Sequence, residues 1–224
     1  MADVDIYGLG PTLSTVTGQT KGLPVHRDYD VYINHWKFLK RSYLGGSEYK
    51  RGLYLKRYAY ENEGEYLTRL AHSAEDNHCR SVIHTYSSFL YRQNPKRDFG
   101  WLESSPEIEH FLEDADMEGR TFENFMRDVN VQSSIYGHCV VLMDRPETQV
   151  GTRAEELQQG IRPYATIYTP ENILNWKFVR KENGHYEIEE LVLLEQAKKP
   201  IKGDRVTFKY RIEDLNQNLL YDEE

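Results

Sequence analysis

The sequence predicts an α+β fold, in which N-terminal helices are followed by a mainly antiparallel β-meander. Apolar residues recur at helical spacing in three segments before residue 137, and the periodicity changes to two after Trp176. A chain of 224 residues is long enough for one large domain or a domain with an appendage. We therefore expect an extended or disordered arm over residues 1–29 and one α+β domain over residues 30–224.

The first helices are expected between residues 30 and 92. Asp30 to Tyr43 forms a helix whose inner side carries Tyr32, Trp36 and Leu39, and Gly45-Gly46 is its C-cap. Residues 63–92 form two helices with a break near residues 75–77. The first places Tyr66, Leu67, Leu70, Ala71 and Ala74 on one face, and the second buries a stripe of Cys79, Val82, Ile83, Tyr86 and Leu90, which Phe89 widens. Arg80, His84, Ser87 and Arg92 remain on the polar side of the second helix.

The central segment, Thr121 to Phe178, is expected to be the core of the fold. A helix begins at Ser105-Pro106-Glu107 and runs to about Asp114, and a solvated acidic turn follows it. The next helix ends at Gly137, and the apolar run Cys139–Met143 predicts a strand buried on both faces. A second strand is expected over Ala165–Tyr168, followed by a turn that ends in Ile173–Trp176.

Alternating residues predict the meander after Trp176. Tyr186, Ile188, Glu190, Val192 and Leu194 form the inward row of one strand. Residues 206–212 form a half-buried strand with a basic solvent face, and residues 219–221 form a further short strand.

Composition limits the setting of the chain without assigning a function. Seventeen tyrosines suit either a subunit that buries much of its surface or a surface-rich monomer. Cys79 and Cys139 are expected as buried free thiols in a reducing compartment rather than as a disulfide. The N-terminus has no signal-peptide pattern, and no apolar run approaches the roughly 20 residues that span a bilayer, so we expect no membrane contact.

Charge is distributed unevenly along the chain. The net charge is -8, yet His35 to Arg57 carries +6, so the remainder carries -14. The cations of this segment, called here the basic strip, are Lys37, Lys40, Arg41, Lys50, Arg51, Lys56 and Arg57. The strip suits phosphate contacts with stacking aromatics, but a solvated strip or one that faces an acidic neighbouring subunit is the interpretation we favour.

The sequence contains no recognisable catalytic motif. A nucleophile elbow, His-Glu-x-x-His and Cys-x-x-Cys are all absent. Asp144 with Glu187 or Glu189 could hold a divalent metal for phosphodiester hydrolysis, although solvated acids on an exposed strand explain them better. We expect no enzyme activity, no cofactor and no metal.

One ordered set of short motifs resembles tailed-bacteriophage portal proteins. It begins with Ser134-Ile-Tyr136-Gly137, continues through the strand to Asp144 and Pro146, and then through Arg162-Pro163-Tyr164, Tyr168, Glu171-Asn172-Ile173 and Asn175-Trp176. Upstream, Gly45-Gly46, Tyr54-Leu55 and Arg92–Pro95 occur in the matching order. The resemblance covers about residues 30–214.

This resemblance implies a wing-like domain in the first part of a longer portal chain, because the stem, clip, channel loop and crown are not recognisable here. It implies a homo-oligomeric ring, usually of twelve subunits, at a capsid vertex of the virion, assembled in the host cytoplasm. The implied partners are the major capsid protein, terminase, tail adaptor proteins and double-stranded DNA passing without sequence specificity. The implied core anchors are Gly137, Asp144, Pro146, Arg162, Pro163, Tyr164 and Trp176. A nucleic-acid-binding module and a metal-dependent nuclease remain the alternatives.

Overall fold

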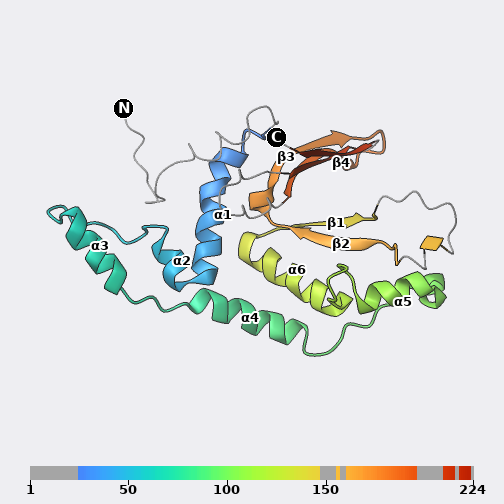
Figure 1. Ribbon diagram of the computed structural model, residues 1–224, viewed down its shortest axis with the longest axis horizontal. Helices are drawn as coiled ribbons and strands as arrows, with labels where there is room; N and C mark the ends of the chain where they lie inside the picture. Colours follow the sequence, from blue (N-terminus) through green and yellow to red (C-terminus); the bar gives the residue numbers. More distant parts are fainter. Residues whose placement is uncertain (1–24, 147–154, 157–159, 196–208, 215–216, 223–224) are drawn as a thin grey trace. The chain divides into compact units, whose positions relative to one another are not determined.

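The computed structural model describes residues 25–146, 155–156, 160–195, 209–214 and 217–222, and these residues have an α+β fold with two antiparallel sheets (Figure 1). The predicted fold class is therefore confirmed. The chain divides into two compact units. Unit 1 combines Met1–His78 with Pro170–Glu224, and unit 2 is Cys79–Thr169. Most of the predicted arm, residues 1–24, lies outside the described residues, and the assignment of residues 30–224 to one wing-like domain stays a prediction.

The helices of unit 1 are α1 (Tyr29–Leu44), α2 (Gly46–Lys50) and α3 (Glu63–His72). The buried residues of α1 are Tyr29, Ile33 and Trp36, whereas Tyr32 is 50% exposed. Trp36 was therefore placed correctly, and the prediction for Tyr32 was wrong by one helical step of about 100°. In α3 only Leu70 is buried; Leu67 and Ala71, which we expected beside it, are exposed.

A meander of four antiparallel strands completes unit 1. A short 3₁₀ helix, η2 (Pro170–Asn172), precedes the strands β3 (Ile173–Arg180), β4 (Tyr186–Glu195), β5 (Lys209–Asp214) and β6 (Gln217–Asp222), which pair in the order β3-β4-β5-β6. The sequence predicted a turn through Ile173–Trp176, and this was wrong because these residues open β3. Irregularities in the β3–β4 register, at Ile173/Asn175 and Lys177/Phe178, break the alternation that identifies a strand.

The alternating pattern predicted for β4 is only partly correct. Val192 is buried as expected, but Leu191 and Leu193 on the other face are buried too. Tyr186 and Ile188, which we expected inward, are exposed. One half of β4 is thus covered on both faces and the other half on neither. Residues 206–208 of the next predicted strand lie outside the described residues, and β6 confirms the strand expected at residues 219–221.

Unit 2 contains three α-helices, one 3₁₀ helix and a two-stranded sheet among its described residues. These are α4 (His78–Leu90), η1 (Gly100–Ser104), α5 (Pro106–Glu113), α6 (Phe122–Tyr136), β1 (Val140–Asp144) and β2 (Tyr164–Tyr168). Phe125, Ala115 and Ala165 form the buried core, with Phe122 and Met126 packed against it. The core therefore joins α6 and β2 of the predicted central segment with the turn after α5, which we expected to be solvated.

The strand β1 is not buried on both faces, contrary to our prediction. Among the described residues it pairs with β2 alone, from Val140 opposite Tyr168 to Asp144 opposite Tyr164. Val141 and Met143 point to the exposed face. A continuous apolar run does not distinguish a central strand from one strand of a two-stranded ribbon, because both favour Val and Leu.

Helix α4 is rotated relative to the expected orientation. The break before it and its helical conformation agree with the prediction, and Ile83 of the predicted core stripe is half-buried, but the rest of that stripe is exposed, namely Cys79, Val82, Tyr86, Phe89 and Leu90. The inward residue is Ser87, which is 3% exposed and which we had placed on the polar side. Both cysteines are free thiols, but the prediction that both are buried was wrong for Cys79, which is exposed. Cys139 is half-buried, and burial raises the pKa of its thiol.

Candidate functional site

The basic strip lies on α1, on α2 and on the loop that leads to α3, all in unit 1. Most of its cations bond other groups of the chain. Lys40 Nζ lies 2.7 Å from Glu171 Oε2, Lys50 Nζ donates to Ala71 O at 2.7 Å, and Arg51 pairs with Glu48 at 2.6 Å. These contacts tie α1 to η2 and α2 to α3. They give Lys40 and Lys50 a structural role within unit 1.

The other members of the strip differ in their surroundings. Arg41 donates to the Tyr54 hydroxyl at 3.4 Å, and Arg57 Nε donates to Glu61 O at 3.0 Å. Burial lowers the pKa of Lys37; Glu171 opposes this shift, and the neighbouring Arg41 and Lys40 add to it. Lys56 and Arg57 are exposed. The basic strip therefore consists of cations on α1, on α2 and in the following loop, and those that form bonds have different partners.

A cluster around Arg69 holds the loop between α2 and α3. Arg69 donates to both carboxylate oxygens of Glu61 at 2.7 Å and to Lys56 O at 2.9 Å. Its guanidinium lies 4.3 Å from the ring centroid of Tyr58. Our sequence prediction missed this cluster. The one readable signal was the capping box of α3, in which Asn62 and Glu65 bond each other's backbone N–H groups.

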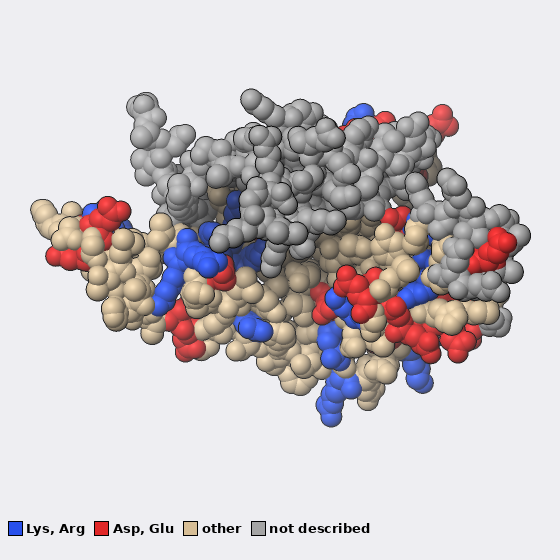
Figure 2. All heavy atoms as spheres, viewed as in Figure 1, with Lys and Arg blue, Asp and Glu red and all other residues tan. Residues whose placement is uncertain are grey.

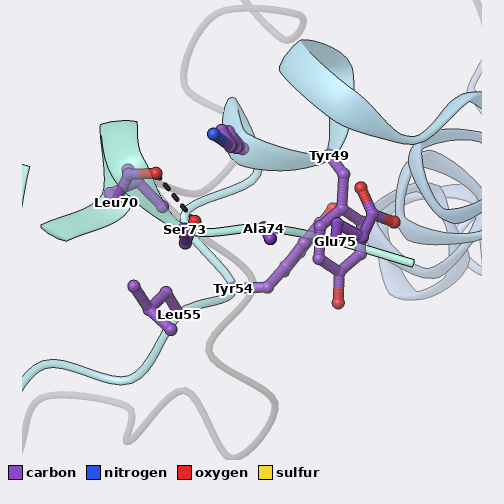
Figure 3. Close-up of a pocket in the computed structure, with 8 residues that line it drawn as sticks. Tyr49, Tyr54, Leu55, Leu70, Ser73, Ala74 and Glu75 are labelled. Atoms are coloured by element: carbon purple, nitrogen blue, oxygen red, sulfur yellow. Dashed lines mark hydrogen bonds between the residues drawn. The ribbon is translucent and has the colours of Figure 1, made fainter. Parts of the chain in front are cut away.

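A cavity of about 170 Å³ lies between α2, the following loop and the end of α3 (Figure 3). Tyr49, Tyr54, Leu55 and Leu70 supply its aromatic and apolar walls. The charged groups beside it are engaged by the backbone, since Lys50 bonds Ala71 O and Glu75 Oε2 accepts from Gly46 N at 2.7 Å. A space of this size holds a few water molecules or one small apolar group.

The carboxylates considered for a nuclease are distributed over both units. Asp144, in unit 2, accepts hydrogen bonds from the Tyr164 hydroxyl at 2.9 Å and from Arg145 N at 2.7 Å. In unit 1, Glu187 lies 3.5 Å from Lys181, and Glu189 forms an ion pair with Lys177. Within the described part of the chain, no three His, Cys, Asp or Glu side chains form a group that could hold a metal ion.

The anchors implied by the portal resemblance occupy packing and turn positions. Gly137 ends α6 in the left-handed conformation, at φ 87°. Asp144 and Tyr164 face each other across β1 and β2 and bond there, and Pro146 follows the end of β1. Trp176, in unit 1, stacks on His26 with ring centroids 4.1 Å apart.

Arg162 fastens the start of β2 to the turn after α5. Its guanidinium donates to Asp114 Oδ2 at 2.5 Å and to the Asp114 carbonyl oxygen, and the adjacent Pro163 is exposed. Burial of Asp114 is outweighed by the hydrogen bond from Gly119 N and by the charge of Arg162, so the pKa of this carboxyl lies below its usual range. The turn we expected to be solvated is thus internally bonded.

Comparison with known proteins assigns no family to the chain. No protein-family model matches it, and no curated protein matches it significantly. Among the described residues, no helix is both long enough and apolar enough to cross a membrane.

Proposed function

We propose that this chain is a structural subunit of a portal-type ring at a capsid vertex, with no catalytic role. The observation that carries the proposal is the outward orientation of α4. Val82, Tyr86, Phe89 and Leu90 are exposed on one side of this helix. Contiguous exposed apolar residues mark surfaces that bind other proteins, and aromatic residues are enriched at such surfaces.

The portal resemblance selects the type of assembly. It supplies the order of motifs from Gly137 to Trp176, and the α+β fold with antiparallel sheets agrees with a wing-like domain. In this proposal the ring conducts double-stranded DNA during genome packaging and ejection. It contacts the major capsid protein, the terminase and tail adaptor proteins, and it resides in the virion after assembly in the host cytoplasm.

The bonding of the basic strip weakens the alternative of a nucleic-acid-binding module. Lys40 and Arg51 pair with carboxylates inside unit 1, so their charges are partly neutralised, and Lys50 is engaged by the Ala71 carbonyl oxygen. The ion pairs of Glu187 and Glu189 with lysines likewise weaken the metal-dependent nuclease. A subunit of a conduit also needs little affinity for DNA, and the net charge of -8 favours weak contact.

The proposal predicts that the complete gene product forms rings. Purified protein should show ring-shaped particles, usually of twelve subunits, under negative-stain electron microscopy. Light scattering after size-exclusion chromatography should give the mass of the same oligomer. Monodisperse monomers at every concentration from about 1 to 100 μM, well above the dissociation constants of stable assemblies, would contradict it.

A further inference from the structure

The exposed side of α4 contains a groove as well as apolar residues. We define the α4 face as Val82, Tyr86, Phe89 and Leu90 together with the groove residues His84, Thr85, Ser88 and Arg92. The groove has a volume of about 420 Å³, and Phe89 belongs to both sets. Phe89 is 70% exposed. Phe89 is the apolar residue of the groove, and the other four lining residues are polar, so an aromatic side chain of a partner could pack on the Phe89 ring there.

The formally charged residues of the segment that contains α4 are all cations, although one of them, Arg97, pairs with Glu123. Residues 78–97 contain no Asp or Glu and four cations, Arg80, Arg92, Lys96 and Arg97. The next segment, residues 98–119, is the opposite. It contains no Lys or Arg and eight acids, namely Asp98, Glu103, Glu107, Glu109, Glu113, Asp114, Asp116 and Glu118. Unit 2 therefore carries a basic block followed by an acidic block.

The acidic block presents its own apolar anchor. Trp101, in η1, is 85% exposed, and Glu103 is exposed beside it in the chain. Figure 1 shows α4 and α5 at different places in unit 2, and Figure 2 shows acidic side chains gathered where α5 lies. Tryptophan is enriched among the few interface residues that contribute most of the binding free energy, particularly where it enters a pocket on the partner.

We propose that the α4 face binds the acidic block and Trp101 of a second copy of this chain. Opposite charges and an apolar anchor facing a groove make the two surfaces complementary. The two surfaces are different parts of one unit, so the contact between copies is head-to-tail. Repeated head-to-tail contacts form a closed ring when the rotation from one subunit to the next adds up to a full turn. The closed ring rests on the proposed function, whereas the contact between two copies can be tested separately.

The first test removes the aromatic side chains of the α4 face. The double variant Tyr86→Gln, Phe89→Gln should weaken self-association about 30-fold or more, measured by analytical ultracentrifugation of the full chain. Tyr60→Gln is the matched control, because Tyr60 is fully exposed in the loop before α3 and belongs to unit 1. The control should assemble like the wild type.

The second test exchanges the charges. One variant carries Arg92→Glu, and a second carries Glu103→Lys with Glu109→Lys. Each variant alone should fail to assemble, because each places like charges on the two sides of the contact. An equimolar mixture of the two variants restores opposite charges at both surfaces of each subunit. The mixture should therefore form complexes that contain both variants, detected by native mass spectrometry.

The outcomes separate this inference from the proposed function. Rings that form unchanged in all variants would overturn the contact and leave the ring proposal intact. Non-ring oligomers that the variants disrupt would support the contact and refute the ring. If a segment of the same chain covers α4, the double glutamine variant should lower the unfolding temperature of the monomer without affecting assembly, and that result would overturn the inference.

Discussion

At the residue scale, Glu61 is held on both carboxylate oxygens by one arginine. Its side chain is 8% exposed, and both of its oxygens accept from Arg69. The hydrogen bonds from Arg69 lower the pKa of Glu61 from 4.5 to about 2. Burial opposes this shift, and the hydrogen bond from Tyr58 N adds to it. The ionised form is therefore favoured by folding. Its contribution to stability is fully present above pH 4.5 and is lost as the pH falls toward about 2.

This pKa shift makes a prediction about acid unfolding. Glu61→Gln should lower the unfolding temperature at pH 7, because an amide cannot accept two charge-assisted hydrogen bonds. The difference between variant and wild type should shrink as the pH falls from about 5 to about 2, as measured by circular dichroism. Glu182→Gln, on the exposed turn between β3 and β4, is the control. A difference that stays constant with pH would contradict the assignment.

At the element scale, the junction of α1 and α2 depends on two glycines with positive φ. Gly45 has φ 66°, and a Cβ at this position would lie 2.4 Å from Asn77 Nδ2. Asn77 cannot move away freely, because Nδ2 donates to Tyr43 O at 2.9 Å. Gly46 has φ 57° but has open space where its Cβ would be. The two positions share a positive φ but differ in crowding, and Gly45 also has ψ -172°, a conformation outside the left-handed helical region that is nearly restricted to glycine.

This difference predicts unequal costs for alanine. Gly46→Ala should destabilise the chain by about 1–2 kcal/mol, the cost of a left-handed residue with a Cβ. Gly45→Ala should cost at least about 1 kcal/mol more, because its backbone conformation is nearly restricted to glycine and because its Cβ would displace Asn77 from Tyr43 O. Urea unfolding of both variants measures the difference. Equal costs would contradict this prediction.

At the scale of the whole molecule, we expect the surface charge to set the affinity of the chain for DNA. The net charge is -8, and the basic strip is partly neutralised by partners such as Glu171 and Glu48. We predict that double-stranded DNA binds with a dissociation constant weaker than about 10⁻⁴ M at physiological salt. Fluorescence anisotropy over a range of salt concentrations measures this.

The control for DNA binding replaces three exposed cations of the strip. Arg51→Gln, Lys56→Gln, Arg57→Gln should leave the weak binding and its salt dependence unchanged. A nucleic-acid-binding module would instead be favoured by micromolar binding of the wild type and a changed salt dependence in this variant. The slope of log K against log salt concentration should then fall in magnitude by about 2–3, because each phosphate contact contributes roughly 0.9 to it.

Most secondary structure was predictable because its signals are local. Proline at N1 predicted α5, Gly137 predicted the end of α6, and the period of two predicted strand β4. The candidate contacts were less predictable. Arg69 reaches Glu61 eight residues away, and Arg162 reaches Asp114 across 48 residues, so no spacing rule connects either pair.

The sequence alone therefore determined the fold class, the helix and strand types and the separation of charges into blocks. These depend on neighbouring residues, whose propensities and periodicity are written in order along the chain. Only the tertiary structure decided the division into two units, the exposure of β1 and the side that α4 turns inward. An amphipathic helix specifies that one of its faces will be covered, but it does not specify by what. In α4, Ser87 packs inward, and Val82, Tyr86, Phe89 and Leu90 are exposed.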